Sequence, residues 1–229
     1  MINLIENNKS AVVLDESGAN LPMALQEDFV IGVYASLDEA IACELARLCC
    51  EESIVPSCKA GCCYCCRHHI LTSIAEAHTL AQYIRREFSA EQINDLRLRT
   101  QQWHEWDNAK PGRYPSSILH DGQDDLSSCA HSCPLDVNGV CGAYPVRPVV
   151  CRTHLVCSSP LSCRAANDPD SGADAPEMLR SVVMAASPFF MAIKVQIESA
   201  GLDFSRSIML LPQWLALEMG WDFSISDEH

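Results

Sequence analysis

Apolar residues recur at intervals of three or four over residues 37–51, which is the spacing of one helix face. Ser36 precedes this stretch as an N-cap, and acidic residues fill the first turn. Segment 28–35, DFVIGVYA, is apolar without a clean period, and we expect a short strand or an arm docked on the core. The pattern predicts an N-terminal helix at about 37–51, with these apolar positions: Leu37, Ile41, Leu45 and Leu48.

Two more helices are predicted after a cysteine-dense stretch. The first covers residues 72–88, where Ser73 and Glu76 have the spacing of a capping box. Its apolar stripe is Ile74, Ala77, Ala81, Ile84 and Phe88. Ser89 opens the second, over residues 90–106. One side of that helix carries Ile93, Leu96, Thr100 and Trp103.

Residues 109–172 are rich in Pro, Gly, Asp and Ser and show no amphipathic period. A structureless region of this length is uncommon in a compact domain, so we expect a metal site to order it. The chain becomes helical again over about 176–220. The C-terminal helices are predicted at 177–186, 188–201 and 212–220.

The composition is that of a folded globular protein. A chain of 229 residues, with 48% hydrophobic and 20% charged residues, can form one domain with a sizeable core. We expect a mainly α, small helical single domain over 1–229. Its cysteine-cluster core, at about 58–155, is expected to be an irregular loop layer organised by a metal site. The net charge of −14 repels phosphate backbones, so no nucleic-acid partner is expected.

The sequence also bears on location. The first twenty residues lack the basic start and apolar run of a signal peptide, and no apolar run reaches the roughly 18 residues of a membrane span. We therefore expect a cytoplasmic protein with no membrane partner, and the sequence leaves open whether it has a protein partner. The cytosol keeps thiols reduced, so the fourteen cysteines indicate metal ligands or core residues before disulfides.

Two cysteine blocks carry the candidate chemistry. Block one is Cys58, Cys62, Cys63, Cys65 and Cys66, and block two is Cys133, Cys141 and Cys151. Cys62 and Cys65 are separated by two residues, a gap that lets both sulfurs reach one metal around a tight turn. Gly61 can supply the positive φ that such a turn needs. The two blocks therefore offer thiolates for a cluster with spare cysteines, or for two metals.

Charge compensation supports a metal at these blocks. Thiolates buried near one another repel, and a metal cation offsets that repulsion most directly. Arg147 lies between two cysteines of block two, and Arg152 directly follows the third. We expect both arginines to offset remaining negative charge and to donate hydrogen bonds to sulfur or to a bound cofactor.

Other cysteines and histidines have less specific patterns. We expect five of the other six cysteines to pack as small hydrophobic residues: Cys43, Cys49, Cys50, Cys157 and Cys163. The sixth, Cys129, lies in the irregular region. Histidines beside a ligand loop lie near the site more often than they bind its metal. The sequence leaves open whether any of these four is a ligand: Cys63, His68, His69 and His154.

Taken together, CKAGCCYCC, the helix containing EAHTLAQYI, and CPLDVNGVCGAYPVRPVVCR resemble the cysteine-cluster family called YkgJ, or CxxCxxCC. The resemblance covers about residues 58–155 and implies a zinc- or iron-chelating domain. This chain departs from the family pattern in a first gap of three residues rather than two and in the extra Cys63. The metal ligands that the resemblance implies are Cys58, Cys62, Cys65, Cys66, Cys133, Cys141 and Cys151.

These observations predict a metal-binding protein. Both cysteine blocks are expected to hold the metal, which is either iron in an iron–sulfur cluster or zinc. Thiol crowding favours iron. The flagellin lysine methylase has a similar cysteine pattern. That resemblance implies one alternative function, an iron–sulfur-dependent enzyme that modifies a protein or peptide by methyl transfer or redox chemistry. A metal chaperone or store is another. No glycine-rich cofactor loop or nucleotide fingerprint is present, so the sequence predicts no catalytic residue.

Overall fold

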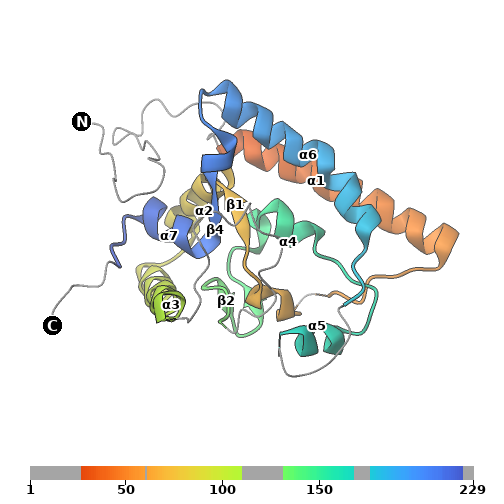
Figure 1. Ribbon diagram of the computed structural model, residues 1–229, viewed down its shortest axis with the longest axis horizontal. Helices are drawn as coiled ribbons and strands as arrows, with labels where there is room; N and C mark the ends of the chain where they lie inside the picture. Colours follow the sequence, from red (N-terminus) through yellow and green to blue (C-terminus); the bar gives the residue numbers. More distant parts are fainter. Residues whose placement is uncertain (1–26, 60, 110–130, 168–175, 224–229) are drawn as a thin grey trace.

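A computed structural model of the chain is mostly helical, which confirms the predicted mainly α fold. The residues that it describes are 27–59, 61–109, 131–167 and 176–223. The main helices are α1 (Glu27–Arg47), α2 (Ile74–Glu87), α3 (Ala90–Ala109), α6 (Arg180–Ser199) and α7 (Leu211–Met219). Figure 1 shows α1 and α6 side by side, running in opposite directions. Residues 1–26, which were examined for a signal peptide, and Cys129 in the irregular region lie outside the described residues.

Helix α1 begins at Glu27, so the strand or arm expected over residues 28–35 is wrong. Tyr34 and Val30 are buried and continue the stripe of Leu37 toward the N-terminus by one and two turns, so packing extends the helix beyond the expected cap. After Arg47 the chain forms a π-helical turn, η2 (Leu48–Glu52). The packing role predicted for the cysteines of this region is also wrong. The exposed thiols are Cys43, Cys49 and Cys50.

The capping boxes place α2 and α3 as predicted. The Ser73 hydroxyl accepts a hydrogen bond from Glu76 N (3.4 Å), and the Glu76 carboxylate accepts one from Ser73 N (3.2 Å). Ser89 opens α3 in the same way, since its hydroxyl accepts from Gln92 N (3.2 Å). Both predicted helices are confirmed at their N-terminal ends, within one or two residues.

Helix α6 joins two segments that were expected to be separate helices. Pro188 lies inside it. A proline removes one helical hydrogen bond, but buried side chains on both sides of Pro188 pack the helix along α1. They are Val182, Ala186, Ile193 and Ile197. By length and composition α6 could also cross a membrane, a test that core helices of water-soluble proteins pass as well.

A short antiparallel pair, not predicted from the sequence, joins the middle of the chain to its C-terminal part. Strand β1 (Leu71–Ser73) pairs with β4 (Ile208–Leu210). Leu211 N donates to Ile70 O (2.8 Å), and the buried Trp214 donates from Nε1 to Thr72 O (3.0 Å). This pairing fixes the segment just after block one against the start of α7.

Candidate metal centre

Block two stands on a hairpin and a short helix. Cys133 precedes strand β2 (Asp136–Val137), Cys141 ends strand β3 (Val140–Cys141), and Cys151 lies in α4 (Val149–Thr153). The hairpin turns at Asn138 and Gly139, both at positive φ, as a two-residue turn requires. The turn therefore sets the position of Cys141 relative to Cys133.

Block one lies on an irregular loop that folds against this hairpin. Gly61 has a φ of +83°, as predicted for the turn, and the 3₁₀ helix η3 (Tyr64–Arg67) presents Cys65 and Cys66. Cys133 N donates a 2.7 Å hydrogen bond to Cys66 O, which joins the two blocks through their backbones. Thiols more than sixty residues apart in sequence are thus brought into one layer.

The Cys65 thiol lies within electrostatic reach of both blocks. Its negative charge, when ionised, helps to raise the pKa of Cys58 in block one and of Cys133 in block two. Burial is the larger cause in each case, and it raises the pKa of Cys133 to about 12. Burial and neighbouring thiols likewise raise the pKa of Cys141 and Cys151. These thiols therefore hold their protons unless a cation stabilises the thiolate form.

Cys65 and Cys66 form a hydrogen-bonded thiol pair. The hydrogen bond from Cys66 lowers the pKa of Cys65 to about 7, and Arg147 adds to that decrease. The same bond, followed by burial, raises the pKa of Cys66. Cys65 is thus set apart as the readily ionised sulfur in the middle of the layer.

The two candidate arginines occupy different environments. Arg147 lowers the pKa of thiols in both blocks, including Cys58 and Cys141. Its guanidinium lies 4.0 Å from the ring centroid of Tyr144, and its buried Nε has no hydrogen-bond partner among the described residues. The positive charge of Arg147 therefore acts on thiols of both blocks.

Arg152 instead acts on the backbone and on α1. Its Nη1 donates to Asp38 (2.6 Å), its Nε donates to Arg147 O (2.9 Å), and its guanidinium stacks on Tyr34 at 4.2 Å. The side chain is 4% exposed. These contacts hold the loop that carries Arg147, rather than a sulfur, so Arg152 serves as a positioning residue in this structure.

Glu76 is a buried carboxylate that sequence analysis identified only as a cap. Its oxygens accept hydrogen bonds from Val149 N (2.8 Å) and from Tyr34 Oη (3.3 Å), in addition to the bonds from Thr72 and Ser73. The bond to Val149 N fixes the first residue of α4, two positions before Cys151. Glu76 therefore ties α4, the helix that carries Cys151, to α2.

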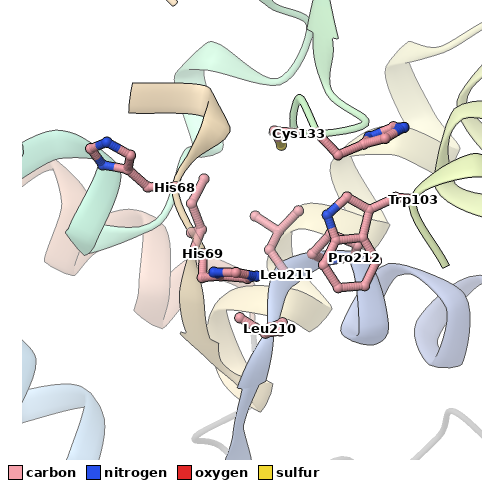
Figure 2. A pocket seen from close by; sticks show the side chains of 9 residues that line it. His68, His69, Trp103, Cys133, Leu210, Leu211 and Pro212 are labelled. Carbon is pink, nitrogen blue, oxygen red and sulfur yellow. The ribbon is translucent and has the colours of Figure 1, made fainter. Parts of the chain in front are cut away.

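Two of the three candidate histidines, His68 and His69, line a small cavity beside Cys133. It has a volume of about 10 Å³ and is lined by His68, His69, Trp103, Cys133 and residues of β4 and α7, as Figure 2 shows. His68 packs edge-on against His154, with ring centroids 4.9 Å apart, and both buried Nε2 atoms lack a hydrogen-bond partner among the described residues. Burial and the neighbouring imidazoles lower the pKa of His68 to about 4.

The side chains do not form a finished coordination sphere. Over the described ranges, no three His, Cys, Asp or Glu side chains are arranged to hold a metal ion. Every described cysteine is a free thiol. Comparison with family models, curated proteins and solved structures found no significant match for this chain. The structure thus brings the two cysteine blocks together, and the metal stays a prediction.

The hairpin turn gives a first test of how this layer is built. We expect Gly139→Ala to destabilise the protein by about 1–2 kcal/mol, because an L-residue is strained at positive φ. The cost is conformational, since a Cβ there would meet only Gly61 O at 3.6 Å and Cys63 Sγ at 3.8 Å. Gly32→Ala, in open space on α1, should stabilise by about 0.5–1 kcal/mol. Urea denaturation of both variants measures the change in the free energy of unfolding. A change of the same sign in the two variants would contradict the conformational role of Gly139.

Proposed function

We propose that this protein binds a metal centre, either an iron–sulfur cluster or zinc, through thiolates of both cysteine blocks. The observation that carries the proposal is the joining of the blocks by the Cys133 N to Cys66 O hydrogen bond, with Cys65 in electrostatic reach of both. The proposed ligands are Cys58, Cys62, Cys65, Cys66, Cys133, Cys141 and Cys151.

The donor set fits a soft metal centre. Thiolates are the ligands of iron–sulfur clusters and of structural zinc, and four of them complete one such site. Burial disfavours isolated thiolates here, so a bound cation would supply the missing stabilisation. Metal binding would require the cysteine side chains to turn toward a common point, within a layer whose backbone is already joined by the Cys133 N to Cys66 O hydrogen bond. The crowding of thiols favours iron over zinc.

The surrounding residues support the same centre. Arg147 faces thiols of both blocks and can offset the net negative charge of a thiolate-bound cluster. Glu76 and Arg152 fix the backbone that carries Cys151 and Arg147. Free thiols in this number suit a reducing compartment, so we propose a cytoplasmic location.

Anaerobic purification followed by elemental analysis and visible spectroscopy tests the proposal. We expect a brown protein with broad visible absorbance, containing iron and acid-labile sulfide. A colourless protein with stoichiometric zinc would select the zinc form. Protein that contains neither metal, and takes up neither after reduction and anaerobic reconstitution, would refute the proposed function.

A further inference from the structure

Cys163 lies outside both blocks and was expected to be a packing residue. It sits in α5 (Pro160–Ala166) and is 5% exposed. Among the described residues it is buried without belonging to the main hydrophobic cluster between the long helices. A cysteine that served only as a small hydrophobic residue would be expected to join that cluster.

The chain brings α5 against block one by hydrogen bonds on both sides of Cys163. Before it, Ser57 N donates to Val156 O (2.9 Å), and Val156 N donates to the Cys58 sulfur (3.4 Å). After it, Asn167 Nδ2 donates to Tyr64 O (2.9 Å), which fastens the end of α5 to η3. An N–H group directed at a cysteine sulfur stabilises its thiolate and is a feature of metal-bound sulfur.

Thiols of block one act electrostatically on Cys163. Burial raises the pKa of Cys163 to about 11, and the next largest contributions come from Cys58, Cys62 and Cys65. Burial dominates the pKa of Cys151 as well, but the thiols that act on it are those of Cys133, Cys65 and Cys141. Different thiols thus act on Cys163 and on Cys151, and Cys65 is the one that acts on both.

We infer that Cys163 is a metal ligand and that the thiols form two adjacent sites. This inference rests on the proposed function. The first site is Cys58, Cys62, Cys65 and Cys163, and the second is Cys66, Cys133, Cys141 and Cys151. Each has the four thiolates of a closed tetrahedral site. Cys66 belongs to the second because its backbone carbonyl binds Cys133 N and its thiol interacts with Cys133.

The division explains why neighbouring residues of η3 are both cysteines. Cys65 and Cys66 each serve a different site, so the short helix links the two metals. Cys63 is then the sulfur left over. Its sulfur lies next to the hairpin turn at Gly139, Asp136 is its largest electrostatic neighbour after burial, and it is not among the thiols that raise the pKa of Cys163 most.

Zinc titration of the reduced, metal-free full chain tests this division, with bound zinc measured after gel filtration. We expect two equivalents for the unsubstituted protein, one for Cys163→Ser, and one for Cys151→Ser. Cys58→Ser should bind the same single equivalent of zinc as Cys163→Ser. This agreement would show that the loss in Cys163→Ser is not caused by a folding defect confined to α5. Cys157→Ser is the matched control and should retain two, because that thiol contacts Glu177 O (3.7 Å) rather than a cysteine.

The outcomes separate the inference from the proposed function. Undiminished zinc in Cys163→Ser would overturn the role of Cys163 while leaving a metal site in the two blocks. Complete loss of zinc in both Cys163→Ser and Cys151→Ser would show one shared site and would also overturn the division. An unsubstituted protein that binds no zinc and no iron would refute the proposed function itself.

Discussion

Cys66→Ala is expected to lose the metal of its site and to melt about 10 °C lower than the unsubstituted protein. The loss corresponds to about 4 kcal/mol, the stabilisation that a ligand gives at a thousand times its dissociation constant. The reason is that residues 131–167 contain only two-residue strands and helices of three to seven residues. Elements this short do not hold together alone, so the proposed metal would supply folding energy to this layer.

Cys43→Ala is the matched control. Cys43 is an exposed thiol on α1, outside both blocks. Its removal should leave the metal content unchanged and alter stability by no more than about 0.5 kcal/mol. Metal analysis and thermal melting of both variants make the comparison. Equal metal retention in the two variants would contradict the ligand assignment.

Glu76→Gln is expected to destabilise the protein by about 3 kcal/mol, because buried donors lose a carboxylate acceptor and face an amide N–H₂. The substitution keeps the size of the side chain, so the effect reports hydrogen bonding and not a cavity. The affected donors are Tyr34 Oη, Thr72 Oγ1, Ser73 N, Ser73 Oγ and Val149 N. Guanidinium denaturation measures the change, and amide hydrogen exchange at Val149 should accelerate.

Glu87→Gln, at the other end of α2, controls for the change of charge. Glu87 is exposed and pairs with Arg86 at the surface (2.8 Å), where an ion pair contributes little. We expect a change within about 0.5 kcal/mol. A Glu76→Gln effect of the same size as this control would show that the buried carboxylate does not hold α4 in place.

Local signals explain which elements the sequence predicted well. The capping boxes at Ser73 and Ser89 combine two reciprocal hydrogen bonds with an apolar stripe, and both helices begin where those residues indicate. Tertiary packing explains two errors. The apolar stripe of α1 continues through Val30 and Tyr34 beyond its expected cap, and packing against α1 carries α6 through Pro188. The pairing of β1 with β4 joins segments too far apart for either to predict the other.

The sequence predicted which cysteines belong to the candidate site better than it predicted how the surrounding residues hold them together. Dense cysteine spacing identified both blocks, and the structure places them in one layer through Cys66 and Cys133. The role of Glu76 in holding α4, and the salt bridge from Arg152 to Asp38, depend on long-range contacts that no local pattern encodes. Cys163 gave no spacing signal because its neighbours lie about a hundred residues earlier in the chain.

X-ray absorption at the metal edge of anaerobically purified protein tests the central claim most directly. A metal held by the two cysteine blocks should show a first shell made of sulfur, at about 2.3 Å in the case of zinc. Iron in a cluster should add a metal–metal contribution beyond that shell. A first shell of nitrogen or oxygen would contradict the account, because the cysteine layer would then not be the site that binds the metal.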